Sequence, residues 1–227
     1  MQEPRLTLRV LSALLRYPDA AFRDAIPELV DAIREEQALP APRIRELTSL
    51  LQQLQAMEPF EAEARYIETF DRGRATSLHL FEHVHGDSRD RGPALVDLGQ
   101  TYERAGLAFE GDELPDHLSV VLEFASTQPA SVSREFLGEM AHILNAVFSA
   151  LRERQSPYAS VVAAVLELAG QQAQAVPVVA DQAMDEAWAE PPAFDGCSSR
   201  GQASPGAPQP IHIVRASKSS ASQGARA

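Results

Sequence analysis

Apolar residues recur at helical spacing along most of the chain. From residue 5 to about residue 186 they fall three or four positions apart, as they do on the buried face of an α-helix. Pro, Gly, Ser and Asp interrupt the pattern at short intervals, where they favour helix starts and ends. The pattern predicts about nine helices, with apolar stripes within residues 6–15, 26–33, 44–57, 60–70, 78–81, 95–105, 118–125, 132–151 and 161–166.

No stretch of the sequence competes with this helical pattern. Runs of alternating β-branched residues are absent, and no internal repeat of fixed period is visible. We therefore predict an all-α fold, in which the helices form one bundle and bury their apolar stripes against one another. A chain of 227 residues is long enough to enclose such a core.

The end of the chain differs in composition from the rest. Residues 189–227 contain five Pro, four Gly and seven Ser, and their only apolar cluster is Ile211, Ile213 and Val214. Such a segment buries too little apolar surface to offset the entropy cost of ordering it. We therefore predict a helical domain over residues 1–188 and a largely disordered tail over residues 189–227.

The predicted helical domain is strongly acidic. The whole chain has a formal charge of −12, and residues 189–227 carry two acidic and four basic side chains, so residues 1–188 carry −14. Binding to nucleic acid or to an anionic membrane surface depends on clustered Lys and Arg, so this charge argues against both as main partners. It favours a basic partner segment instead.

The sequence predicts a cytoplasmic protein. The apolar stretch from Leu6 to Leu15 is too short for a bilayer, which needs about 20 apolar residues, and Arg9 interrupts it. The single cysteine, Cys197, cannot form an intramolecular disulfide, so nothing calls for an oxidising compartment. In a flexible tail this thiol is expected to be inert.

Common signatures of catalysis are missing, but histidines are clustered. The chain has no glycine-rich phosphate loop, no Cys-x-x-Cys pair and no Gly-x-Ser-x-Gly elbow. Four of its six histidines lie within residues 78–118. His79 and His83 are four positions apart and would share a helix face, where Glu82 or Asp87 could complete a metal shell. The commoner alternative is that these histidines hydrogen-bond backbone groups and acids at the end of a short helix.

The residues around these histidines alternate in charge. Arginine pairs with carboxylates in a planar, bidentate geometry, so one interpretation is an internal ion-pair network that fixes a long connection against the bundle. The other interpretation is a recognition surface, and the network is the more frequent of the two. The charged and histidine residues of this stretch are Asp71, Arg72, Arg74, His79, Glu82, His83, His85, Asp87, Arg89, Asp90 and Arg91.

Four segments carry a resemblance to a known family. They are EARY at 63–66, TFDRGRATSLHLFEHVHGDSRDRG at 69–92, ELPDHLSVVLEF at 113–124 and AWAEPPAF at 187–194. Together they resemble the NarJ family, the molybdenum cofactor assembly chaperones of respiratory nitrate reductase, and the resemblance covers roughly residues 6–194. The Pro-Asp-His-Leu segment is similar in addition to the TorD and DmsD type of redox-enzyme maturation chaperones.

This resemblance implies a cytoplasmic, cofactor-free, all-helical protein without catalytic activity. Such a chaperone would bind the unassembled catalytic (alpha) subunit of nitrate reductase, partly through the N-terminal segment of that subunit. It would hold the subunit competent for insertion of the molybdenum cofactor, delay its docking on the membrane subunit, and be absent from the finished enzyme. Molybdenum cofactor biosynthesis proteins are further candidate partners.

Four residues are candidates for binding the partner peptide. In families of this kind Pro-Asp-His-Leu belongs to the leader-recognising region, which makes Asp116 and His117 candidates. By its position alone Asp116 could instead be the N-cap of the apolar helix that follows, and His117 could be an ordinary surface histidine or one that titrates near neutral pH. Tyr66 and Phe70 lie one helical turn apart and either line a groove or belong to the core.

An alternative function comes from the histidine cluster. A metal-dependent enzyme or metal carrier would be built on His79, His83 and His85. It would differ from a chaperone in holding stoichiometric zinc or iron.

Overall fold

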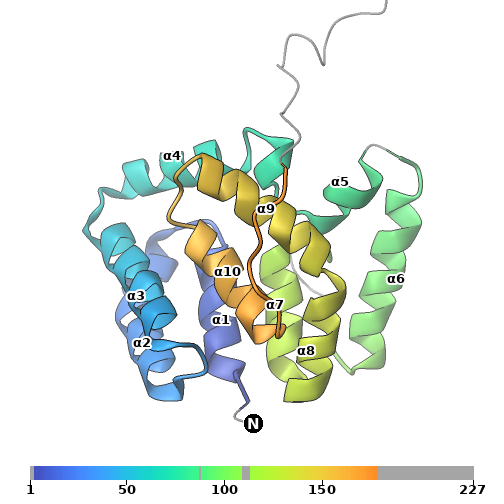
Figure 1. Ribbon diagram of the computed structural model, residues 1–227, viewed down its shortest axis with the longest axis horizontal. Coiled ribbons are helices and arrows are strands. Elements are labelled where there is room, and N and C mark those ends of the chain that lie inside the picture. The colour runs from blue at the N-terminus through green and yellow to red at the C-terminus, as the bar shows by residue number, and fades with distance from the viewer. Residues whose placement is uncertain (1–2, 87, 109–112, 178–227) are drawn as a thin grey trace, which may run out of the picture. The chain divides into compact units, whose positions relative to one another are not determined.

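Ten α-helices and one short 3-10 helix make up the regular structure of residues 3–86, 88–108 and 113–177, which the computed structural model describes (Figure 1). No strand occurs among these residues, so the prediction of an all-α fold is confirmed. The 3-10 helix, η1, is Arg74–Thr76. The α-helices are α1 Arg5–Leu14, α2 Ala20–Glu36, α3 Ala41–Ala56, α4 Pro59–Phe70, α5 Leu80–His85, α6 Arg91–Arg104, α7 Leu118–Thr127, α8 Ala130–Glu139, α9 Ala141–Glu153 and α10 Ala159–Leu168.

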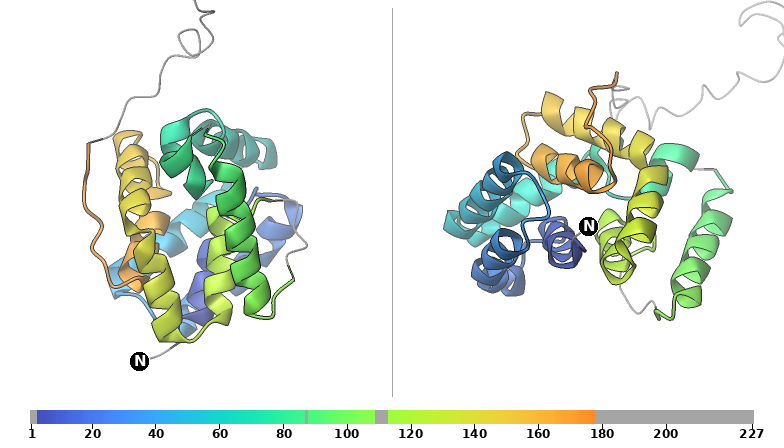
Figure 2. Two further views of the ribbon diagram at one scale, coloured as in Figure 1. Left: turned by 90° about the vertical axis from the view of Figure 1, so that its right-hand side faces the viewer. Right: turned by 60° about the horizontal axis from the view of Figure 1, so that its bottom comes forward.

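Helices α1 and α10 form the centre of the core. Figure 2 shows α1 between α2 and α3 on one side and α7 and α8 on the other, and α1 packs against α2, α7 and α10. In α10 every side chain from Val161 to Leu166 is fully buried. A helix that is apolar on all sides must be covered on all sides, and α10 is in contact with α1, α3, α8 and α9.

The long apolar stripe at 132–151 forms two helices rather than one. Helix α8 ends at Glu139 and α9 begins at Ala141, with Met140 between them at φ −91° and ψ 1°. Gly138 in the last turn of α8 weakens a continuous helix by about 1 kcal/mol relative to Ala. The two helices also bury their stripes on different neighbours, since α8 contacts α7 and α10 whereas α9 contacts α10, η1 and α5. Figure 1 shows them running in different directions.

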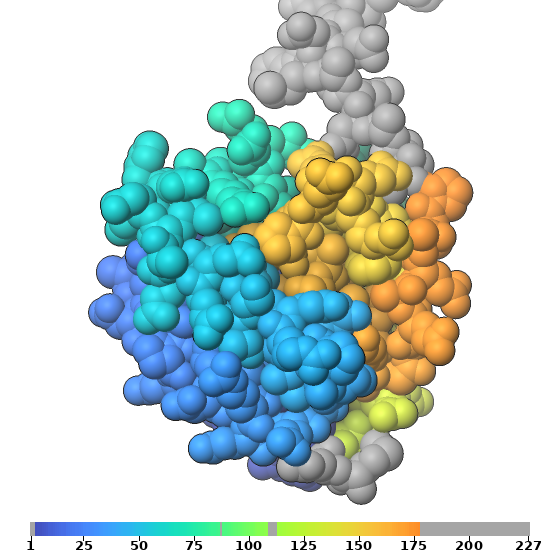
Figure 3. All heavy atoms as spheres, turned by 60° about the vertical axis from the view of Figure 1, so that its left-hand side comes forward, coloured from blue at the N-terminus to red at the C-terminus, as the bar shows by residue number. Residues whose placement is uncertain are grey.

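The chain that follows α10 lies along α9. Two backbone N–H groups of this segment donate hydrogen bonds to side chains of α9, Gln174 to Asn145 Oδ1 at 2.7 Å and Val176 to Ser149 Oγ at 2.9 Å. Figure 3 shows the segment in orange beside the yellow α9. Cys197, the AWAEPPAF segment and the rest of the predicted tail lie outside the described residues, so the boundary at residue 188 stays a prediction. Among the described helices, none is both long and apolar enough to cross a membrane.

A buried carboxylate caps the start of α1. Pro4, the residue before the helix, provides no side-chain cap. Instead, Glu36 at the end of α2 accepts hydrogen bonds from the backbone N–H groups of Leu6 at 2.8 Å and Thr7 at 2.6 Å. First-turn N–H groups have no partner within their own helix, and a negative charge next to them is favourable. This contact fastens α1 to α2 at residues 30 positions apart.

Glu36→Ala is therefore expected to lower the free energy of unfolding by about 1–3 kcal/mol, because it leaves two partly buried donors unpaired. Urea unfolding followed by circular dichroism measures the change. Glu35→Ala is the matched control, since Glu35 is exposed, and it should change stability by no more than about 0.5 kcal/mol. Equal stability of the two variants would contradict the capping role.

Candidate functional site

The two sequence motifs meet next to α5. The segment at 69–92, called the charged string below, contains His79. The backbone of His79 pairs with that of His117, in the Pro-Asp-His-Leu segment, as an antiparallel β-bridge. The backbone N–H of Leu118 donates to the carbonyl oxygen of Leu78 at 2.8 Å as part of this pairing. Two segments that are nearly forty residues apart in the sequence thus form one structural unit.

Asp116 is the centre of this unit. Its side chain is 0% exposed. One carboxylate oxygen, Oδ2, accepts a hydrogen bond from the backbone N–H of Phe81 at 3.0 Å and lies 3.9 Å from Nη2 of Arg91. The other, Oδ1, lies 3.3 Å from Nδ1 of His79. Asp116 therefore caps the first turn of α5, where backbone N–H groups lack partners within the helix.

The prediction that Asp116 caps the helix directly after it, α7, is wrong, because Asp116 caps α5 instead. Helix α7, which directly follows, has His117 as its N-cap residue, and His117 Nδ1 accepts from the backbone N–H of Ser119 at 3.4 Å and lies 2.7 Å from Ser119 Oγ. Asp116 turns away from α7 because its carboxylate is occupied by α5. His117 is buried, so the interpretation as a surface histidine is also wrong.

Part of the charged string forms an ion-pair network around Arg91. Nη1 of Arg91 lies 3.1 Å from Oε1 of Glu82, and Oε2 of Glu82 accepts a hydrogen bond from the Ser77 hydroxyl at 2.6 Å. His83 Nε2 lies 2.9 Å from the carbonyl oxygen of Ser77, which can only accept, so Nε2 carries the proton. These contacts hold the segment before α5 against the first turn of α6.

The other described histidine and charged residues of the charged string either pack against a neighbouring side chain or are exposed to solvent. The ring of His85 packs edge-on against Phe81, with 5.7 Å between ring centroids. Asp87 lies outside the described residues. The remaining members of the family motif are exposed, namely Asp71, Arg72, Arg89 and Asp90.

Helix α6 supports the turn that carries Asp116. The hydroxyl of Tyr102 donates a hydrogen bond to the carbonyl oxygen of Pro115 at 2.8 Å. Tyr102 also packs with Leu98 and Phe124 in a small cluster of buried residues that joins α6 to α7. The turn is thus fixed from both sides, by α5 and by α6.

The two paired histidines have opposite electrostatic surroundings. The hydrogen bond to Asp116 raises the pKa of His79 above its ordinary value of 6.5. Burial lowers the pKa of His117 below the same value. Burial alone would raise the pKa of Asp116, but the hydrogen bonds from His79 and Phe81 and the charge of Arg91 lower it below 3.8. At neutral pH the buried Asp116 is therefore ionised.

These shifts predict two separate titrations in the metal-free chain. By NMR of the imidazole carbons, His79 should titrate above pH 6.5 and His117 below it. Protonated His79 therefore stabilises the fold below pH 6.5, and this contribution is lost as pH rises through its folded pKa. Buried neutral His117 has the reverse effect, since stability is lost as pH falls below 6.5. In Asp116→Asn the His79 midpoint should fall, and an unchanged midpoint would contradict the pairing.

Comparison with known proteins identifies the family. The family described as "Nitrate reductase delta subunit" matches residues 17–164. The chain is 46% identical over 164 residues to the nitrate reductase molybdenum cofactor assembly chaperone NarJ of Escherichia coli K12, with 72% of this chain and 70% of that protein covered. The chain belongs to the NarJ family. The predicted resemblance is thereby confirmed, and the family is one of chaperones for molybdenum cofactor assembly of nitrate reductase, not of enzymes.

More distant relatives agree with this NarJ-family assignment. The Bacillus subtilis protein named "Probable nitrate reductase molybdenum cofactor assembly chaperone NarJ" is 31% identical over 165 residues, with 71% of this chain and 87% of that protein covered. A crystal structure of a candidate redox enzyme maturation protein from Archaeoglobus fulgidus superposes with a TM-score of 0.52 at 21% identity, covering 74% of this chain and 94% of that one. At 21% identity, the similarity to the Archaeoglobus fulgidus structure supports the fold alone.

Tyr66 and Phe70 belong to the core of this NarJ-family protein. Their side chains are 6% and 5% exposed, and their ring centroids lie 5.0 Å apart. Phe70 packs edge-on against Tyr158, and the Tyr66 hydroxyl donates to the carbonyl oxygen of Leu15 at 2.8 Å. Of the two interpretations that the sequence left open, the structure shows the core, so these rings do not line an open groove.

The histidine pair expected on one helix face is not formed. His79 is the residue before α5, and His83 is turned toward the carbonyl oxygen of Ser77. The described residues bring together a different set, His79, Glu113 and His117, whose donor atoms all lie within 4.8 Å of one another. Glu113 was missed because it belongs to the other motif. Its position four residues before His117 was the only signal in the sequence.

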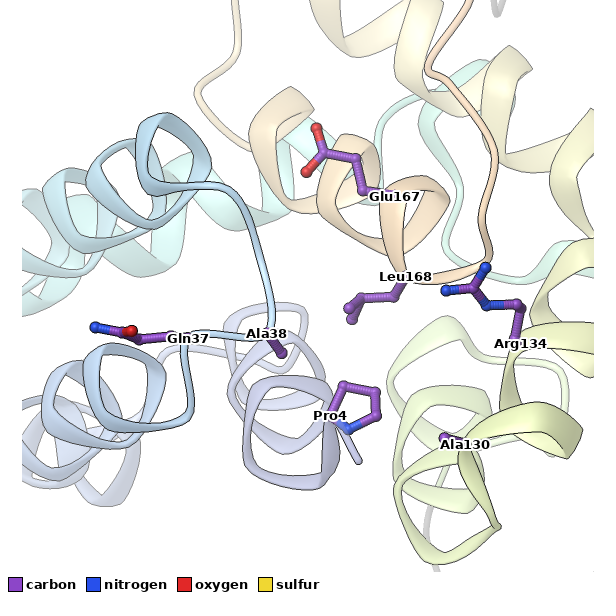
Figure 4. Close-up of a pocket in the computed structure, with 7 residues that line it drawn as sticks. All are labelled: Pro4, Gln37, Ala38, Ala130, Arg134, Glu167 and Leu168. Carbon is purple, nitrogen blue, oxygen red and sulfur yellow. The ribbon is translucent and has the colours of Figure 1, made fainter. Parts of the chain in front are cut away.

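A small pocket lies away from both motifs, at the ends of α1, α2, α8 and α10 (Figure 4). Its volume of about 200 Å³ is below the range of roughly 300–1,000 Å³ that is typical of small-molecule sites. The Glu167 carboxylate at its edge is already paired with Arg43 at 2.9 Å. The lining residues are Pro4, Gln37, Ala38, Ala130, Arg134, Glu167 and Leu168. None of them belongs to the family motifs.

Proposed function

We propose that this chain is a cytoplasmic assembly chaperone that binds the unassembled catalytic (alpha) subunit of respiratory nitrate reductase, partly through the N-terminal segment of that subunit. It holds the subunit competent for molybdenum cofactor insertion, delays its docking on the membrane subunit and is absent from the finished enzyme. Molybdenum cofactor biosynthesis proteins are further candidate partners. The observation that carries the proposal is the 46% identity over 164 residues to the E. coli chaperone.

The domain division is part of the same proposal. The chaperone domain comprises residues 1–188, and residues 189–227 form a separate Pro-, Ser- and Gly-rich tail. The family match over residues 17–164 supports this division, because it lies wholly within the first part.

The outer face of α4 is the surface that best suits a basic, amphipathic client segment. Phe60 is 81% exposed, and Ala64 and Ile67 follow it at helical spacing on the same face. Acidic residues flank this stripe on the same helix, among them Glu61 and Glu68. An apolar stripe bordered by acids is complementary to an amphipathic helix with basic edges. Figure 3 shows atoms of α4 at the surface of the molecule, on the side that faces the viewer.

Asp116 and His117 contribute to this function indirectly. Both side chains are buried, so neither is available to a client in this conformation. Their hydrogen bonds instead fix the segment before α5 to the start of α7. Substitution at either position is therefore expected to act first through the stability of this unit, and only then on client binding.

Calorimetric titration of the chain with a synthetic N-terminal peptide of the cognate catalytic subunit tests the proposal. Binding in the micromolar range is expected, and Phe60→Ser should weaken it by about tenfold, the effect of losing a central apolar contact. Val132→Ser on α8 is the matched control, because Val132 is also exposed, at 46%, and lies on a different helix. Absence of heat at tens of micromolar peptide would contradict client recognition through this segment, and equal affinities of both variants would exclude the α4 face.

A further inference from the structure

A set of metal-ligating side chains lies where the two motifs meet. His79 is the residue before α5, and Glu113 and His117 lie in the turn before α7. Each offers one donor atom, and these atoms all lie within 4.8 Å of one another. His117 is buried, His79 is half-buried and Glu113 is exposed, so the set is open to solvent on the side of Glu113. We propose that His79, Glu113 and His117 form a binding site for a divalent transition metal ion such as Zn²⁺.

Buried partners hold both imidazole rings in place. Nδ1 of His79 lies 3.3 Å from the carboxylate of Asp116, which is the arrangement that orients most metal-binding histidines. Nδ1 of His117 lies 2.7 Å from the hydroxyl oxygen of Ser119. Nε2 of His79 has a free lone pair while its Nδ1 donates to Asp116. His117, whose Nδ1 accepts from the Ser119 N–H, offers Nε2 to a metal only when its proton moves to Nδ1, which then donates to the Ser119 hydroxyl oxygen. The rings lie close, with 5.0 Å between centroids.

The donor set determines the kind of ion. Two imidazoles and one carboxylate are typical of zinc and of similar divalent transition ions, and they leave a fourth position for water or a donor from a partner. Tetrahedral zinc places its donors about 3.4 Å apart, so binding requires them to move closer together. Glu113 can make this movement, because its side chain is exposed.

The charges around the set are mixed. The carboxylates of Asp116 and Asp71 favour a cation there, since each interacts with His79. Arg91 near Asp116 and Arg16 near His117 oppose it. A bound ion would link the residue before α5 to the turn before α7 and so strengthen the unit that Asp116 holds together. This role does not depend on the proposed client.

Zinc binding to the purified, untagged full-length chain tests the site. After removal of metals with EDTA, Zn²⁺ is titrated in competition with a chromophoric chelator, and Co²⁺ is added separately to record the visible absorption of a tetrahedral site. We expect one ion per chain. His79→Gln and Glu113→Gln should each weaken binding by at least about tenfold, because losing even the hydrogen-bond partner of a metal ligand typically costs about 10- to 100-fold in affinity. Because Glu113 is exposed, Glu113→Gln is expected to fold normally, which thermal unfolding checks.

Two other histidine variants serve as controls. His83→Gln removes a histidine of the same string, whose Nε2 is occupied by Ser77, and His142→Gln removes an exposed histidine on α9. Both should bind zinc as tightly as the unchanged chain. The proposal is overturned if the unchanged chain binds no stoichiometric zinc, if Glu113→Gln and His79→Gln bind it equally well, or if His83→Gln or His142→Gln abolishes binding.

Discussion

Asp116→Ala is expected to destabilise the fold by about 3–5 kcal/mol, the usual cost of removing one partner from a buried, charged network. The carboxylate is fully buried and serves the backbone of Phe81 and the side chains of His79 and Arg91 at once. Alanine leaves the Phe81 N–H and His79 without this acceptor and removes the negative charge near Arg91, so that only backbone hydrogen bonds still join the start of α5 to the turn before α7. The loss should therefore exceed that of an ordinary helix cap, which is about 1 kcal/mol.

Urea unfolding at neutral pH measures this effect, with two further variants for comparison. Asp116→Asn keeps an oxygen that can accept from Phe81 and should lose less stability than alanine. Asp90→Ala removes an exposed acid of the same family motif and should change stability by no more than about 0.5 kcal/mol. If Asp116→Ala were as stable as Asp90→Ala, the buried network would not hold the two motifs together.

Leu11→Ala is expected to cost about 2–5 kcal/mol, because it removes a fully buried side chain from the centre of the core. Leu11 lies on α1, which packs against α2, α7 and α10. A cavity at this position therefore loosens several helices rather than one pair. Ser12, the next residue, donates a hydrogen bond to the carbonyl oxygen of Ser119 at 2.8 Å, which limits how far α7 can shift to fill the space.

Leu6→Ala provides the control for this prediction. Leu6 lies on the same helix but is 43% exposed, and the backbone N–H that it donates to Glu36 is unaffected by the substitution. The midpoint of urea unfolding should fall clearly for Leu11→Ala and change little for Leu6→Ala. Similar midpoints would show that α1 is not the centre of the core.

The helical pattern predicted the fold well because burial in this protein follows the helix period. The stripe at 6–15 contains the buried face of α1, and the stripe at 161–166 is the fully buried part of α10. The break between α8 and α9 could not be predicted, since no proline marks it. It depends on which neighbours each half packs against, and that information is spread over distant parts of the chain.

The sequence pointed to the segments of the candidate site but not to its geometry. The string at 69–92 and the segment at 113–124 were both recognised, yet nothing in the sequence showed that they pair. Asp116 was expected to cap the helix beside it, because capping preferences are local. The structure uses it for a helix that begins 36 residues earlier, at Leu80. Glu113 could not be assigned to the site from local sequence either, since its two neighbours in space, His79 and His117, belong to different motifs.

The molybdenum content of nitrate reductase in cells that lack this protein tests the central claim most directly. The catalytic subunit would be isolated from a deletion strain and from the same strain carrying the gene on a plasmid, and molybdenum per subunit would be measured in both. The account predicts a subunit that is present but lacks most of its molybdenum in the deletion strain, with the content restored by the plasmid. A fully metallated subunit in the deletion strain would contradict it.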